Sequence, residues 1–123
     1  MKRTIFERYG GFARISRIVS AMYDKILDSP LTAPYFEGVD MRRLIDHQTR
    51  FVATLMGGPA SYTNEQLERA HARLGITEPA FAEMVALLGK TLEEFGFADE
   101  DIAEVERQML DRKHLIVARS MAW

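Results

Sequence analysis

Apolar residues recur along most of the chain at intervals of three and four positions, which is the spacing of one face of an α-helix. No segment alternates convincingly between apolar and polar residues, so strands are not expected. Glycine and proline interrupt the pattern at "YGG", "SP", "GGP" and several single glycines. The predicted helices span about 3–8, 12–28, 41–56, 64–74, 78–95 and 99–116, the first and fourth of them short.

The segments between these helices carry their own signals. Residues 31–40, "LTAPYFEGVD", hold a proline and a glycine and predict a compact corner with little regular structure. Thr77, followed by glutamate and proline, is a good N-cap for the helix after it. The chain is therefore expected to be all-α, with residues 1–123 forming one domain.

Composition narrows the class of protein. Of 123 residues, 47% are hydrophobic and 28% are charged, which is typical of a globular chain. The net charge of −2 gives no electrostatic reason to expect nucleic-acid binding. The absence of cysteine excludes disulfides, zinc–thiolate sites and cysteine nucleophiles. No apolar run follows the basic N-terminus, so neither a signal peptide nor a membrane span is expected, and the cytoplasm is the expected location.

Three polar residues interrupt the apolar helix faces: Tyr23, Gln48 and His71. An unpaired buried polar group costs about 1–3 kcal/mol, so each needs an explanation. Taken singly, each is most simply a core residue whose polar atom is satisfied nearby. Taken together, they indicate a polar spot inside an apolar pocket, which is the usual character of a ligand site.

His71 is the candidate metal ligand among the three. One histidine does not enclose a transition metal by itself, but it can supply one axial ligand to haem iron, since the porphyrin supplies four nitrogens. Its other ring nitrogen would then need an acceptor, for which a carbonyl one turn back near Leu67 is a candidate. The alternative is a core histidine bonded to such a carbonyl.

Five short motifs, taken in order, resemble a known family. They are "YGG" at 9–11, "AMYDKIL" at 21–27, "LTAPYFEGVDMRRL" at 31–44, "MGGPASY" at 56–62 and "AHARLGIT" at 70–77. Their order and spacing resemble a group 1 truncated haemoglobin over nearly the whole chain. The resemblance implies a two-over-two helical sandwich around haem b (iron protoporphyrin IX), with a short first helix and a short proximal helix.

The resemblance also assigns residues. It makes His71 the iron ligand and matches Tyr23 and Gln48 to the distal hydrogen-bonding pair. Leu44 falls where many globins carry a distal histidine or glutamine. The residues expected to line the haem are Phe36, Leu44, Phe51, Leu55, Leu67, Leu74, Ile76, Phe81, Met84 and Val85. Candidates for contacts with the haem propionates are Arg43, Arg50, Tyr62 and Arg73.

Two further histidines leave alternatives open. In some cyanobacterial and algal members a histidine at the position of His47 swings in and binds the sixth position of the iron. Otherwise His47 is a solvent-facing residue near a propionate, because it lies about 100° from the centre of its apolar stripe. In some cyanobacterial relatives a last-helix histidine, spaced like His114, bonds covalently to a haem vinyl group. Otherwise His114 is exposed in a fraying terminal helix.

The resemblance implies a protein that binds O₂, NO and CO at its iron, for oxygen transport, storage or sensing. The alternative is a haem enzyme that converts nitric oxide to nitrate or turns over other reactive nitrogen or oxygen species, with an external reductase as partner. A haem-free helical interaction module is a third class, against which His71 argues.

Overall fold

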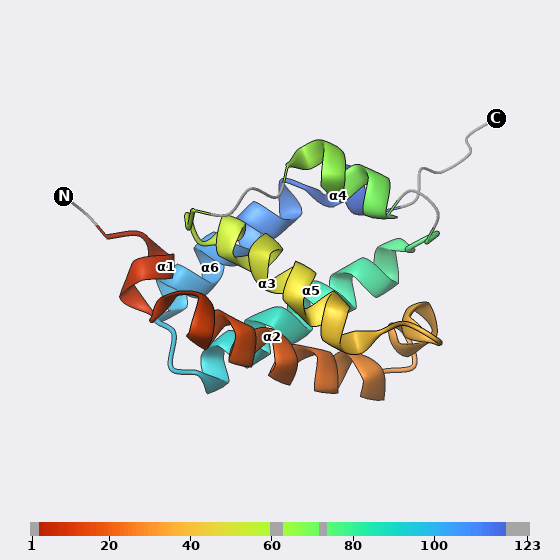
Figure 1. The fold of residues 1–123 in the computed structure, drawn as a ribbon, viewed down its shortest axis with the longest axis horizontal. Helices are drawn as coiled ribbons and strands as arrows, with labels where there is room; N and C mark the ends of the chain where they lie inside the picture. Colours follow the sequence, from red (N-terminus) through yellow and green to blue (C-terminus); the bar gives the residue numbers. More distant parts are fainter. Residues whose placement is uncertain (1–2, 60–62, 72–73, 118–123) are drawn as a thin grey trace.

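The computed structural model describes residues 3–59, 63–71 and 74–117. Regular structure in these residues is entirely helical, which confirms the all-α prediction (Figure 1). Among these helices, none combines the length and apolar content needed to cross a lipid bilayer. The elements are the helices α1 (Ile5–Arg8), α2 (Gly11–Asp28), α3 (Met41–Leu55), α4 (Asn64–His71), α5 (Glu78–Glu94), α6 (Asp99–Leu110) and α7 (Lys113–Ile116), with the 3₁₀-helix η1 (Ala33–Phe36).

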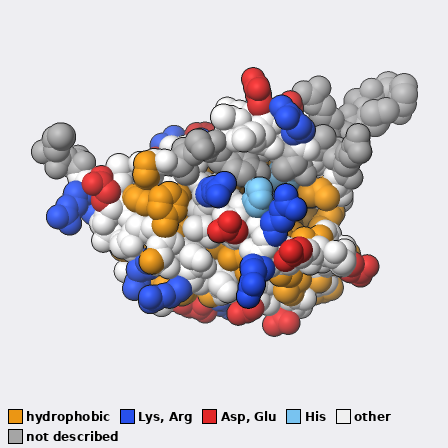
Figure 2. Space-filling model, viewed as in Figure 1, with side chains coloured by type: hydrophobic (Ala, Val, Ile, Leu, Met, Phe, Trp, Pro, Cys, Tyr) orange, Lys and Arg blue, Asp and Glu red, His pale blue; other side chains and the backbone are white. Residues whose placement is uncertain are grey.

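Two pairs of long helices form the body of the fold. α2 packs against α3 and also against α5, and α5 packs against α6. α3 reaches α6, while the short α4 contacts α7. In Figure 1, α2 runs along the lower side of the body and α4 along the upper side. Figure 2 shows basic and acidic side chains interspersed over this face of the molecule.

The apolar stripe of α2 is the centre of the core. Ile15, Ile18 and Val19 are completely buried there. Burial of each such side chain contributes about 1.5–3 kcal/mol. Phe12 and Leu27, which the pattern places on the same stripe, are instead 42% exposed. Both lie next to an end of α2, at the margin of the stripe.

The corner after α2 is more regular than predicted, because residues 33–36 form η1. Pro34 lies in the first turn of η1, where its missing N–H leaves no bond unmade. Thr32 fixes the corner: its buried hydroxyl donates to the carbonyl oxygen of Ile26 at 2.6 Å. The predicted N-cap of α5 is confirmed, since the Thr77 hydroxyl accepts a hydrogen bond from the backbone N–H of Ala80 at 3.2 Å.

The prediction of one continuous last helix is wrong. α6 ends at Leu110, the chain turns, and α7 begins at Lys113. Arg112 stabilises the turn by donating to the carbonyl oxygen of Gln108 at 2.9 Å, a group that the end of α6 leaves without a helical partner. The turn returns the chain to the body of the fold, where Ile116 is buried.

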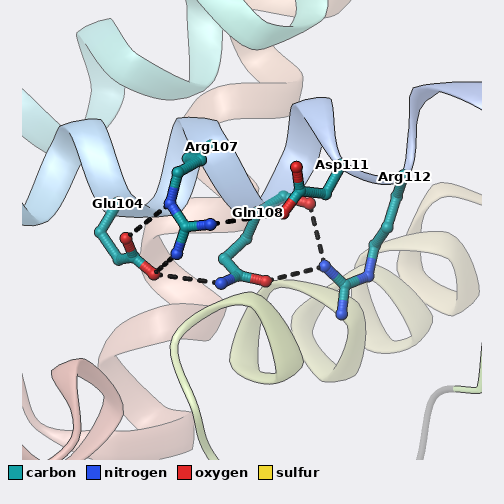
Figure 3. A network of polar contacts seen from close by, with 5 residues as sticks. All are labelled: Glu104, Arg107, Gln108, Asp111 and Arg112. Carbon is teal, nitrogen blue, oxygen red and sulfur yellow. Dashed lines mark hydrogen bonds and ion pairs between the residues drawn. The ribbon is translucent and has the colours of Figure 1, made fainter.

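Side chains along α6 brace this turn in a chain of polar contacts (Figure 3). Arg112 also donates to Oε1 of Gln108 at 3.0 Å, and Nε2 of Gln108 donates to Glu104 at 3.0 Å. Glu104 forms an ion pair with Arg107 at 2.6 Å. Periodicity cannot reveal such a turn, because apolar residues continue at helical spacing beyond it.

A second set of contacts fastens α1 to the start of α6. Arg8 donates two hydrogen bonds to the carboxylate of Asp101, at 2.9 and 2.7 Å. The Tyr9 hydroxyl donates to the same carboxylate at 2.6 Å and accepts from the backbone N–H of Ala98 at 3.1 Å. The Tyr9 ring stacks on Phe97 with centroids 3.7 Å apart. We call Arg8, Tyr9, Phe97 and Asp101 the α1 clasp.

Asp101→Asn is expected to lower the free energy of unfolding at neutral pH. It is also expected to reduce the loss of that free energy as the pH is lowered. Hydrogen bonds from Arg8 and Tyr9 hold the pKa of Asp101 below its usual range. The stabilisation is therefore complete above the unfolded pKa of about 3.9 and is lost as the pH falls through the lower folded pKa. Urea unfolding at several pH values between neutrality and acid measures it. Glu100→Gln, which neutralises an exposed carboxylate in the first turn of the same helix, is the control. Wild-type and Asp101→Asn stabilities that change in parallel with pH would contradict the prediction.

Candidate functional site

A largely apolar cavity opens inside the helical body, with about 760 Å³ of empty volume including its mouth. Seven of the eight elements contribute to its wall, all but α1. The lining residues are Met22, Tyr23, Ile26, Phe36, Leu44, Gln48, Phe51, Val52, Leu55, His71, Leu74, Ile76, Met84, Leu88, Met109 and Ile116.

Within this lining, the polar side chains are those of Tyr23, Gln48 and His71. These are the same three residues that stand out as polar interruptions of apolar helix faces in the sequence. α2 and α3 supply Tyr23 and Gln48, and the last residue of α4 supplies His71. In Figure 1, α2 and α4 lie on opposite sides of the body, and the cavity lining takes residues from both helices.

His71 is held in one orientation by its own helix. Its Nδ1 lies 2.8 Å from the carbonyl oxygen of Leu67, one turn back, which confirms the acceptor expected from the sequence. A carbonyl only accepts, so Nδ1 carries the proton and Nε2 keeps a lone pair. Burial lowers the pKa of His71, against an opposing effect of the Leu67 carbonyl. The imidazole is therefore neutral at pH 7, the form that ligates a metal.

Tyr23 and Gln48 differ in how they are held. Tyr23 is only 6% exposed, and its ring meets the edge of the Phe36 ring at 89°, with centroids 5.4 Å apart. Gln48 is half-buried, and its amide makes no hydrogen bond to another residue in the described part of the chain. Both N–H donors of the Gln48 amide are thus available to a ligand in the cavity.

The other residues predicted to line the haem, to ligate its iron or to bond to it covalently fall into three groups. Seven apolar ones line the cavity: Phe36, Leu44, Phe51, Leu55, Leu74, Ile76 and Met84. Leu67, Phe81 and Val85 pack in the core or against it, outside the lining. His47 and His114 are exposed and are also outside the lining.

Of the four residues predicted to contact propionates, the structure describes Arg43 and Arg50, and neither lines the cavity. Both arginines are exposed and border adjoining surface hollows that share Ser16 and Asp46. Tyr62 and Arg73 lie outside the described residues.

The sequence analysis did not identify six of the lining residues: Met22, Ile26, Val52, Leu88, Met109 and Ile116. All are apolar and lie at core spacing on their helices. Periodicity reports that a side chain faces inward, but a wall of a cavity and a packed core give the same signal. Only the polar lining residues had a signal that could distinguish the two.

Tyr35 does not line the cavity, but it connects two segments that do. Its hydroxyl donates to the carbonyl oxygen of Gly75 at 3.4 Å and accepts from the backbone N–H of Thr77 at 3.2 Å. The neighbouring residues Phe36 and Ile76 both line the cavity. Tyr35 therefore fastens η1 to the segment that follows His71.

The donor set of the cavity fits haem better than a bare metal ion. In the described part of the chain, no group of three or more histidine, cysteine or acidic side chains could hold a metal. One neutral imidazole in an apolar cavity can instead complete the coordination of an iron whose macrocycle already supplies four nitrogens. His71 would hold the iron, and the apolar lining would hold the macrocycle.

Comparisons with known proteins support haem as the cofactor. The sequence model of the bacterial-like globin family matches residues 4–118. A group 1 truncated hemoglobin of Tetrahymena thermophila is 30% identical over 104 residues, which cover 85% of this chain and 86% of that protein. A group 1 truncated hemoglobin of Nostoc commune is 29% identical over 109 residues, 89% of each chain.

Solved structures show the same architecture. The truncated hemoglobin of Tetrahymena pyriformis in its Fe(III) form superposes with a TM-score of 0.86 at 26% identity, covering 95% of this chain and 100% of that one. The 2/2 hemoglobin of a Synechococcus species, in the cyanomet state with covalently attached haem, gives 0.85 at 24% identity with the same coverage. The chain therefore belongs to the bacterial-like globin family and is a group 1 truncated haemoglobin with the two-over-two fold.

Proposed function

We propose that the protein reversibly binds O₂, NO and CO at a haem iron held by His71, with Tyr23 and Gln48 as the groups that contact the bound ligand. The haem supplies an iron with one coordination position for an external ligand. The observation that carries the proposal is that the three polar side chains of the lining are one neutral imidazole and two hydrogen-bond donors.

Tyr23 and Gln48 would act through their donors. A hydroxyl and an amide stabilise partial negative charge that develops on a bound ligand, and such hydrogen bonds are stronger in a low-dielectric cavity than in water. Leu44, Phe51 and Leu55 on α3 surround Gln48 with apolar wall and limit the entry of water. The leucine at 44 adds no competing donor or iron ligand.

The test is the visible absorption spectrum of the purified protein in its ferric, ferrous and CO-bound states. A Soret band shows haem, and the ferrous–CO spectrum distinguishes a proximal histidine from other ligands. A protein that is purified without a Soret band and does not acquire one when haem is added would overturn the proposal. Because His114 is exposed outside the lining, we propose that haem is held without a covalent bond to it.

The exposed position of His47 favours a sixth position that is open to external ligands. We expect a high-spin ferric spectrum at neutral pH, which His47→Leu leaves unchanged, because a solvent-facing imidazole does not ligate the iron. The matched control is His114→Leu. A low-spin wild-type spectrum that becomes high-spin only in His47→Leu would contradict this expectation. External ligands would then have to displace His47, and their apparent affinity would fall with the open fraction.

Tyr35→Phe is expected to speed haem dissociation about two- to tenfold, because the hydrogen bonds that fasten η1 to residues 75–77 are worth about 0.5–1.5 kcal/mol in total at an exposed site. Transfer of haem to an excess of an acceptor apoprotein measures the rate. An unchanged rate, with an unchanged unfolding midpoint, would show that this hydroxyl does not help to close the cavity.

A further inference from the structure

We propose that Met22, Met84 and Met109 form a thioether site in the cavity wall, at which peroxides are consumed by oxidation of methionine to methionine sulfoxide. The described part of the chain contains five methionines, and these three line the cavity. Each comes from a different helix, α2, α5 and α6 respectively, so the fold and not the local sequence brings them to one cavity. The inference rests on the proposed binding of haem in this cavity.

Burial distinguishes two of these methionines, Met22 and Met109, from side chains that oxidants reach freely, whereas Met84 is partly buried. Met22 and Met109 are 7% and 9% exposed, and an oxidant in solution would reach them poorly. Met56 is buried to 2% exposure but does not line the cavity, and the partly buried Met41 does not line it either. Met56 is therefore a natural internal control: it is as well shielded from solvent as Met22 and Met109, but it lies away from the cavity.

The chemistry needs a peroxide and a thioether. A haem held by His71 would supply the peroxide chemistry inside the cavity, so oxidation would be localised to the methionines that line it. In the net step one peroxide oxygen bonds to the methionine sulfur through a sulfur lone pair, and the other leaves as water with both protons. The sulfur is oxidised by two electrons and hydrogen peroxide is reduced by two, so no further reductant is required.

Oxidation of a lining methionine also changes the polarity of the cavity wall. Methionine is apolar and adapts to irregular gaps, whereas its sulfoxide is polar and chiral. The lining of the cavity is otherwise largely apolar, and the side chains in it that could donate a hydrogen bond to a sulfoxide oxygen are those of Tyr23, Gln48 and His71. Oxidation is thus expected to loosen the apolar contacts around the haem and to speed its release.

The experiment compares the protein loaded with haem and the protein loaded with zinc protoporphyrin, which fills the cavity without peroxide chemistry. Both are treated with a small molar excess of hydrogen peroxide, digested, and mapped by mass spectrometry. In the haem protein we expect several-fold more oxidation at Met22 and Met109 than at Met56. In the zinc protein this difference should disappear. Equal oxidation of Met22, Met109 and Met56 in the haem protein would overturn the inference.

A second measurement tests the consequence for haem. Met22→Leu/Met109→Leu replaces both thioethers with apolar side chains of similar volume. Haem release to an acceptor apoprotein is measured before and after peroxide treatment. We expect treatment to speed release several-fold in the wild type and in the control Met56→Leu, but much less in the double variant. An equal acceleration in all three would overturn this consequence. Failure to form a Soret band at all would instead count against the proposed haem binding.

Discussion

His71→Gly is expected to abolish stable haem binding, and added imidazole is expected to restore it. His71 supplies the one imidazole in the cavity lining. Its Nδ1–H donates to the Leu67 carbonyl, so the lone pair on Nε2 is the one available to an iron. Loss of a group that only orients a metal ligand already costs about 10- to 100-fold in metal affinity. Loss of the ligand itself should cost more.

The readouts for His71→Gly are haem titration followed by the Soret band, with and without millimolar imidazole. Free imidazole can enter the space left by the side chain and ligate the iron in its place. His114→Gly is the matched control, since it removes an exposed histidine that lies outside the lining. A full Soret band in His71→Gly without imidazole would remove His71 from the role of iron ligand.

Tyr23→Phe is expected to raise the dissociation rate of O₂ by roughly 10- to 150-fold. A hydrogen bond to a group with substantial charge is worth about 1.5–3 kcal/mol, and each 1.4 kcal/mol corresponds to a factor of about ten. Phenylalanine keeps the aromatic ring and its edge contact with Phe36, so the change is limited to the hydroxyl. CO, which carries less negative charge when bound, should respond much less.

Stopped-flow displacement of O₂ by CO measures this rate. Tyr9→Phe is the matched control, because it removes the same hydroxyl from a tyrosine of the α1 clasp, outside the lining. A double-mutant cycle with Gln48→Leu then tests whether Tyr23 and Gln48 act on the same ligand. An O₂ dissociation rate that is the same in Tyr23→Phe as in wild type would exclude the Tyr23 hydroxyl from ligand stabilisation.

The polar part of the cavity could be predicted from the sequence because it departs from the usual pattern, in which inward-facing helix positions are apolar. Tyr23, Gln48 and His71 lie on apolar helix faces, where an unsatisfied polar group is costly, so each one called for a partner or a ligand. The hydrogen bond from His71 to Leu67 was predictable for a related reason, since residues four apart on a helix are neighbours.

The apolar part of the cavity could not be predicted in the same way. Met22 and Ile26 share the stripe of α2 with Ile15 and Ile18, yet the first pair lines the cavity and the second pair is closed core. The difference depends on what packs opposite, which is decided by contacts among helices distant in the sequence. The turn between α6 and α7 was not predicted for a similar reason. Arg112 stabilises the turn through a polar contact, and the helical spacing of the apolar residues continues across it.

The turn after α6 has a consequence for the order in which the protein is assembled. Ile116 on α7 and Tyr23 on α2 line the same cavity, so the cavity combines an early and a late part of the chain. A chain emerging from the ribosome presents α2 and α3 first, with one side of the future cavity still missing. We therefore expect haem to be captured only after α7 has been synthesised, and the earlier nascent chain to expose an apolar surface that needs protection until then.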